Sequence, residues 1–176
     1  MTILVVGIFD DFNSVHNAIS GLFDIGYQKQ LTVVGREVDN YEATQRLDEE
    51  LLTTNAVEKP YYGALFSSIS DEVTNIKFID FQELGKVIFG GVLADTLVSL
   101  LPMENNHPKL IAESLSSIGI PSEKVEFYYE NLLKGLVLIM VTTRPGKESE
   151  IVEILKEYGA LHTDATTVNV DIKPGI

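Results

Sequence analysis

The chain of 176 residues is 45% hydrophobic and 22% charged, close to the average of folded proteins, which argues against wholesale disorder and predicts a single domain over residues 1–176. It carries 26 acidic side chains against 13 Lys and Arg, and a net charge of −13 repels nucleic-acid phosphates and anionic lipid headgroups, so no nucleic-acid partner is expected. The absence of cysteine excludes disulfides, thiolate metal ligands and thiol catalysis.

The N-terminal segment shows no export signal. Residues 1–12 lack a positively charged stretch and a small-residue cleavage site, so we expect a cytoplasmic protein. The most membrane-like segment, residues 87–103, contains Asp95 and is shorter than the roughly 20 residues that a spanning helix needs. We therefore expect no transmembrane segment and interpret these residues as buried core, with peripheral membrane binding as the alternative.

The first 38 residues predict a strand, a helix and a second strand. Residues 3–9 are continuously apolar and rich in β-branched side chains, which is typical of a strand covered on both faces. Asp10, Asp11 and Asn13 supply helix-capping chemistry, and hydrophobic residues then recur at helical spacing until Gly26. Residues 31–38 are more polar and partly alternating, as in a strand at the edge of a sheet.

The C-terminal end repeats this arrangement. Residues 136–143 form a second continuous apolar strand, a helical stripe follows and stops at Gly159, and residues 166–172 alternate in polarity. Two such units predict an α+β, ferredoxin-like core: an antiparallel sheet in the strand order 4-1-3-2, with both helices on one face. The core halves are residues 1–38 and 136–172.

Residues 39–135 are expected to be a mainly helical insertion. Its first part, residues 39–60, is acidic and indicates a surface connection. A helix is predicted over residues 108–119 and another stripe ends at Pro102, while residues 87–91 could form either a strand or a helix. Central strands that are apolar on both sides need a second cover. Either the insertion or a second subunit supplies it, so we expect a homo-oligomer, a dimer in the simplest case.

The next helix is predicted from Pro121 to Gly135. Pro121 fits a first helical turn and Ser122 offers a cap. Because adjacent helical residues point about 100° apart, one of Tyr128 and Tyr129 is expected in the core and the other at the surface, where it could contact a ligand or a partner.

Glycines and aromatic residues recur in several blocks of the chain. These blocks are residues 5–27, 119–121, 128–130, Gly135 with the apolar strand after it, and 159–160. In this pattern the chain resembles the small bacterial general-stress-protein domains of the heat-induced stress protein type. Residues 39–75 have no match to them, and residues 86–97 stand where many relatives are richer in glycine. The resemblance implies a stress-associated protein and supplies no catalytic residues.

Few motifs indicate a specific chemistry. Arg144, Gly146 and Lys147 precede a helix, where backbone amides can receive an anion, although a solvated turn is the ordinary interpretation. His162 and Asp164 have a spacing that could place both near a metal, and a simple loop pair is the alternative. Nucleotide-binding glycine motifs, HExxH and the serine nucleophile elbow are missing from the sequence. We expect neither a cofactor nor a metal.

These observations predict a non-catalytic binding protein, stress-associated or regulatory, that self-associates. The alternative is a small-molecule sensor or enzyme whose pocket lies between the sheet and the helical insertion. The candidate ligand or interface residues are Tyr128, Tyr129, Arg144 and Lys147. The identity of the small molecule is not predicted.

Overall fold

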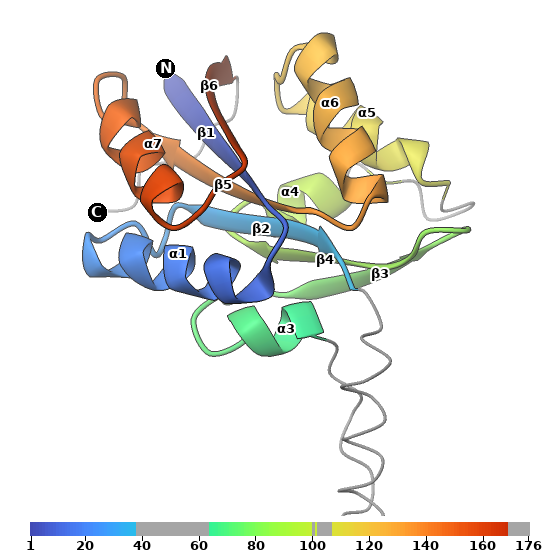
Figure 1. Cartoon of the computed structure of the whole chain (residues 1–176). Helices are drawn as coiled ribbons and strands as arrows, with labels where there is room; N and C mark the ends of the chain where they lie inside the picture. The colour runs from blue at the N-terminus through green and yellow to red at the C-terminus, as the bar shows by residue number, and fades with distance from the viewer. Residues whose placement is uncertain (38–63, 100, 102–106, 169–176) are drawn as a thin grey trace, which may run out of the picture.

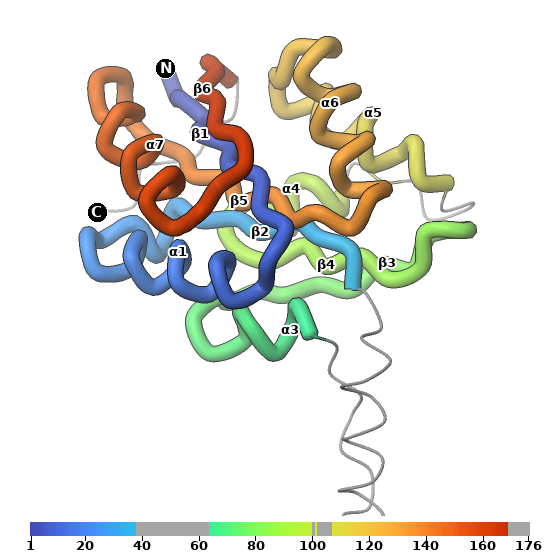
Figure 2. Tube along the Cα trace, in the orientation of Figure 1, coloured from blue at the N-terminus to red at the C-terminus, as the bar shows by residue number. Residues whose placement is uncertain are grey.

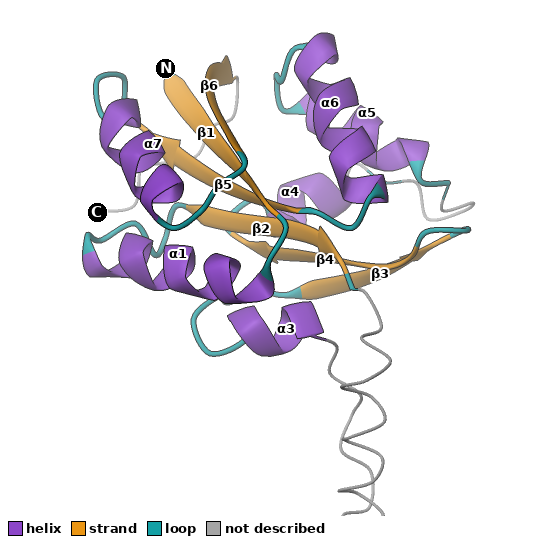
Figure 3. Cartoon of the chain, in the orientation of Figure 1, coloured by secondary structure: helices purple, strands orange, loops and turns teal. Residues whose placement is uncertain are grey.

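The fold is α+β, with one six-stranded antiparallel sheet and helices on both of its faces (Figures 1 and 3). The structure, a computed structural model, describes residues 1–37, 64–99, 101 and 107–168. The strands are β1 (Thr2–Phe9), β2 (Leu31–Arg36), β3 (Lys77–Phe81), β4 (Gly85–Gly91), β5 (Val137–Thr143) and β6 (His162–Val168). The helices are α1 (Phe12–Asp24), α3 (Ala64–Ile69), α4 (Ala94–Ser99), α5 (Lys109–Ser117), α6 (Ser122–Leu133) and α7 (Glu148–Glu157).

The strand order in the sheet is β3-β4-β2-β5-β1-β6. The two apolar strands of the sequence, β1 and β5, are neighbours inside the sheet, and every residue of β5 is buried. The first and last strands, β1 and β6, lie side by side although most of the chain separates them (Figure 2). The prediction of an antiparallel α+β fold is therefore confirmed.

Helices α1, α7 and α3 cover one face of the sheet (Figure 1). Asp11 caps α1 as predicted, because its Oδ1 accepts a hydrogen bond from the Asn13 amide at 3.0 Å. The buried side of α1 (Val15, Ala18, Ile19, Leu22) then packs with Ile151 and Leu155 of α7 over the alternate residues of β1, β2 and β5 that point to this side.

Helices α4, α5 and α6 cover the other face. Leu97, Ile111 and Leu115 of α4 and α5 pack with Val125, Tyr128 and Leu132 of α6 over Leu4, Val6 and Ile8 of β1 and Leu138 and Met140 of β5. These helices all belong to the insertion. The sequence left two candidates for covering this face, the insertion or a second subunit. The insertion covers it, so both sides of the central strands are packed.

The described part of the insertion contains more helix than strand, as expected, together with one hairpin. Residues 77–91 form the hairpin β3–β4, so residues 87–91, which could have been strand or helix, are strand. Two predictions about individual elements are wrong. Strand β2 is not an edge, because β4 pairs with it from Thr32 to Arg36. Strand β6 begins at His162, four residues before the predicted start.

The capping prediction for α6 is also wrong. Pro121 occupies the N-cap position, Ser122 is the first helical residue, and within the described part of the chain no side chain caps this helix by a hydrogen bond. The helix instead starts through the Pro121 carbonyl, which accepts from the Lys124 and Val125 amides at 3.0 Å each. The predictions for residues 39–60, for the helix end at Pro102 and for residues 169–172 lie outside the described residues.

Candidate functional site

Tyr128 and Tyr129 separate as expected. Tyr128 is the one that belongs to the core. Tyr128 is 1% exposed, and burial raises the pKa of its phenol well above the ordinary value, with a smaller contribution from the Asp164 carboxylate. Tyr129 is half-buried, and burial followed by the Glu126 carboxylate raises the pKa of its phenol. Neither residue lines the depression that contains Arg144 and Lys147.

Arg144 and Lys147 lie exposed in the turn between β5 and α7. They line an open depression of about 340 Å³ together with Ile25, Gly26 and Tyr27 of the loop before β2. The Gly146 amide, which would have to receive an anion there, donates to Glu148 Oε2 at 2.7 Å. A carboxylate of the chain therefore already occupies the position that the anion hypothesis requires.

His162 and Asp164 have separate contacts. Asp164 Oδ2 accepts from Lys124 Nζ at 2.8 Å, and the His162 ring packs edge-on against the Phe127 ring with centroids 4.9 Å apart. Within residues 1–37, 64–99, 101 and 107–168 no three His, Asp or Glu side chains gather as metal ligands would. In the same ranges no helix is long and apolar enough to cross a membrane.

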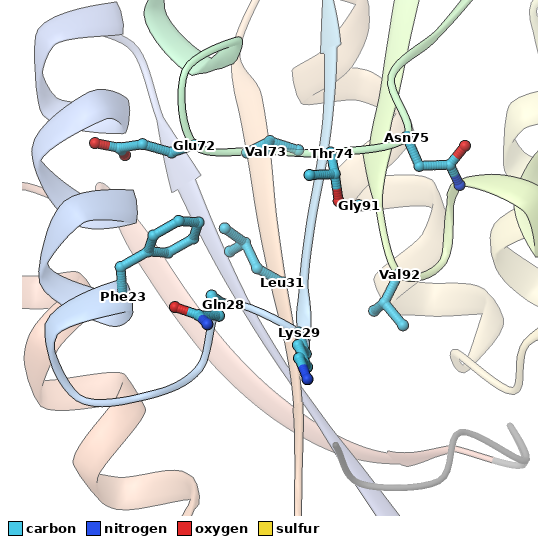
Figure 4. Close-up of a pocket in the computed structure, with 10 residues that line it drawn as sticks. All are labelled: Phe23, Gln28, Lys29, Leu31, Glu72, Val73, Thr74, Asn75, Gly91 and Val92. Carbon is cyan, nitrogen blue, oxygen red and sulfur yellow. The ribbon is translucent and has the colours of Figure 1, made fainter. Parts of the chain in front are cut away.

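A larger cavity lies where the first core half meets the insertion. This cavity, the α1–insertion pocket, has a volume of about 530 Å³ (Figure 4). Its walls come from the end of α1, the start of β2, the α3–β3 turn and the end of β4. The lining residues are Phe23, Gln28, Lys29, Leu31, Glu72, Val73, Thr74, Asn75, Gly91 and Val92.

Backbone hydrogen bonds hold these walls together. The Gly91 amide donates to the Thr74 carbonyl at 2.9 Å, and the Val92 amide donates to the Leu31 carbonyl at 3.0 Å. Gly91 has φ +105°, and a Cβ at this position would overlap the Leu31 carbonyl oxygen and lie 2.9 Å from Thr32 Cα. Only glycine permits this close approach of the strands.

The wall formed by the α3–β3 turn is held against α1 by a side chain. Ser20 Oγ of α1 donates to Glu72 Oε1 at 2.8 Å, and Figure 4 shows the carboxylate turned toward α1 and away from the middle of the pocket. Glu72 Oε2 is buried and receives no hydrogen bond from the described residues. Glu72 therefore links the α3–β3 turn to α1 through Oε1, while Oε2 has no hydrogen-bond partner among the described residues.

The interior of the pocket combines an apolar floor with a polar rim. Leu31 and Val73 are 2% and 5% exposed, and the Phe23 ring and the Leu31 side chain face each other across the hollow (Figure 4). At the rim, Asn75 Nδ2 donates to Asp95 Oδ2 at 3.0 Å. The hydrogen bonds from Lys77 and then Asn75 lower the pKa of the Asp95 carboxyl.

Sequence patterns could not locate this pocket. Its lining comes from four segments between residues 23 and 92, and none of them carries a ligand-binding motif. The one available signal was the pair Gly90–Gly91, because paired glycines in a strand indicate close backbone approach.

Comparison of the chain with protein-family models, with curated proteins and with solved structures gave no match. The resemblance to general-stress-protein domains therefore stays a prediction.

Proposed function

We propose that this protein is a non-catalytic, regulatory or stress-associated binding protein that takes up a small organic molecule in the α1–insertion pocket. The observation that carries the proposal is the pocket itself. Its volume of about 530 Å³ falls inside the roughly 300–1,000 Å³ range of small-molecule sites, and an apolar floor with a few polar groups at the rim is their usual lining.

The position of the pocket agrees with the alternative raised from the sequence, a sensor with its site between sheet and insertion. The residues differ from those expected. Phe23, Leu31, Val73 and Thr74 replace Tyr128, Tyr129, Arg144 and Lys147 as the candidate ligand contacts. Because two parts of the chain form the walls, a ligand would bridge them and stabilise their contact.

A ferredoxin-like arrangement of the core is part of the proposal. Strands β6, β1, β5 and β2 are neighbours in the order 4-1-3-2, and α1 and α7 pack on the same face. The hairpin β3–β4 would then extend this core beside β2.

Self-association is not needed for binding at this pocket. The sequence argument for a dimer was the need to cover a second apolar face, and α4, α5 and α6 cover that face. The dimer therefore stays a prediction without that support.

The first test is a thermal-shift screen with small carboxylates, amines, nucleosides and aromatic alcohols. A compound that binds only the folded chain raises Tm, and at 100 times its Kd it adds about 2.7 kcal/mol to the free energy of unfolding. Thr74→Trp places a large ring at the exposed rim of the pocket and should abolish the shift. Thr96→Trp makes the same exchange at an exposed position on α4 outside the pocket and should retain it.

Two results would contradict the proposal. One is a screen in which no compound raises Tm of the wild-type chain. The other is a compound that stabilises the wild-type and Thr74→Trp chains equally, because it would then bind elsewhere. Amide chemical shifts of Gly91 and Val92 during a titration would locate the site directly.

A further inference from the structure

Strand β6 ends the sheet and, among the described residues, pairs with β1 alone. An end strand presents backbone N–H and C=O groups that can pair with a strand of another chain. Proteins that stay soluble usually block such an edge, often with a lysine.

The registers of the sheet show which groups of β6 face outward. The Thr142 amide donates to the Gln30 carbonyl, so the neighbouring residue Val141 directs its own N–H and C=O toward β1. Val5 lies opposite Val141 and returns those bonds, so its backbone groups point away from β6. Ala165 lies opposite Val5 on the other side, and its N–H and C=O therefore face out of the sheet.

Two side chains occupy these outward groups. The Ala165 amide donates to Asp164 Oδ1 at 2.9 Å, and the Ala165 carbonyl accepts from Lys124 Nζ at 3.4 Å. Lys124 Nζ also lies 2.8 Å from Asp164 Oδ2, and each of the two side chains is 32% exposed. Helix α6 thus reaches over the edge of the sheet and closes it in the middle of β6.

Two exposed apolar side chains flank this closure. Phe127, one turn after Lys124 on α6, is 41% exposed and packs on His162, and Leu161 just before β6 is 60% exposed. An edge flanked by exposed apolar side chains is a favourable site for strand addition once its backbone groups are open.

We propose that Lys124 and Asp164 close the β6 edge against a second copy of this chain, and that removing them allows two β6 strands to pair antiparallel about Ala165. In that register Ala165 faces its own counterpart, Thr163 faces Thr167, and Asp164 faces Thr166. No like charges are opposed, so β6 is complementary to itself. This role is independent of the α1–insertion pocket.

The test compares self-association constants by sedimentation velocity. Lys124→Ala/Asp164→Ala should raise the association constant by at least about tenfold over the wild-type chain. Lys156→Ala/Glu157→Ala removes the same two charges from exposed positions on α7 and should leave it unchanged. Adding Ala165→Pro to the first variant removes the outward N–H and should return the constant to the wild-type value.

Lys124→Met serves if the double variant fails to fold, because it keeps the aliphatic stem and opens only the carbonyl half of the edge. It should raise the association constant to a smaller extent. The proposal is overturned if the folded variants associate no more strongly than the wild-type chain. It is equally overturned if their association survives Ala165→Pro, since the contact would then lie on another surface.

Discussion

Tyr128 and Gly91 have structural roles that their residue types do not suggest. Tyr128 was a candidate ligand contact, yet among the described residues it is the largest fully buried side chain and packs between α6 and the sheet. This burial raises the pKa of its phenol. Gly91 carries no side chain at all and still shapes the pocket, because any Cβ there meets the Leu31 carbonyl.

The raised pKa of Tyr128 predicts a loss of stability at alkaline pH. In the unfolded chain its phenol ionises near the ordinary pKa of 10.0, whereas in the folded chain it stays protonated to a higher pH. The unfolded state therefore binds fewer protons above pH 10.0, and the free energy of unfolding falls as pH rises from there. Below that pH the contribution is constant.

Urea denaturation of the wild-type and Tyr128→Phe chains, from neutral pH to values above 10.0, tests this prediction. The wild-type chain should lose more stability over the alkaline range, because the variant lacks the group that titrates late. Parallel losses in both chains would show that Tyr128 ionises normally when folded. The absorbance of the phenolate gives an independent titration of the folded chain.

At the scale of elements, the insertion is joined to the core through β2. Strand β4 pairs along β2, and the chain then turns sharply into α4. Thr32 of β2 is fully buried, and its Oγ1 accepts a hydrogen bond from the Leu93 amide at 2.9 Å, just before α4 begins. The Thr32 side chain thus fixes the point at which the chain leaves β4 and enters α4.

Thr32→Val should lower the free energy of unfolding by about 1–3 kcal/mol, because valine keeps the shape and leaves the Leu93 amide buried without an acceptor. Chemical denaturation measures the change. Thr163→Val is the matched control on the half-buried strand β6, because the Thr163 hydroxyl has no hydrogen bond to the described residues, and its effect should stay within about 0.5 kcal/mol. Equal effects of the two substitutions would show that the Thr32 hydroxyl contributes nothing.

At the scale of the whole molecule, two apolar layers sandwich the sheet. The layer under α1, α3 and α7 and the layer under α4, α5 and α6 share the strands between them. Alternate residues of β1 and β5 point into each layer, so loss of either layer exposes the other side of the same strands. The insertion and the two core halves should therefore unfold together.

Leu115→Ala on α5 tests this coupling. The side chain is fully buried, and its loss should lower the free energy of unfolding by about 2–5 kcal/mol in a single transition. The free energy of opening that amide exchange measures in β1 and β5, outside the substituted helix, should fall by the same amount. Ser116→Ala at the neighbouring exposed position is the control and should change little.

A separate early transition would contradict the coupling, since the insertion would then unfold while β1 and β5 kept their wild-type protection. Tyrosine fluorescence can follow both transitions, because the chain contains no tryptophan.

Much of the secondary structure was predictable from local patterns. The apolar runs of β1 and β5, the Asp11 cap and the stripes of α1, α5 and α7 all act over a few residues, and the structure contains each of them. The hairpin β3–β4 was not predicted as such, because the pattern of β3 is short, with only Phe81 buried, and residues 87–91 were left open as strand or helix. Strand β2 was misplaced at the edge because residues 31–38 are more polar than the other strands and partly alternate, whereas β4 pairs along it.

The sequence by itself determined the antiparallel α+β class and the need for two covers, because hydrophobic period and run length act locally and follow from side-chain chemistry. Only the tertiary structure decided that the insertion supplies the second cover, that β4 lies beside β2, and that residues between 23 and 92 meet in one pocket. These are contacts between segments far apart along the chain. Their geometry depends on strand register and packing, which local sequence patterns do not specify.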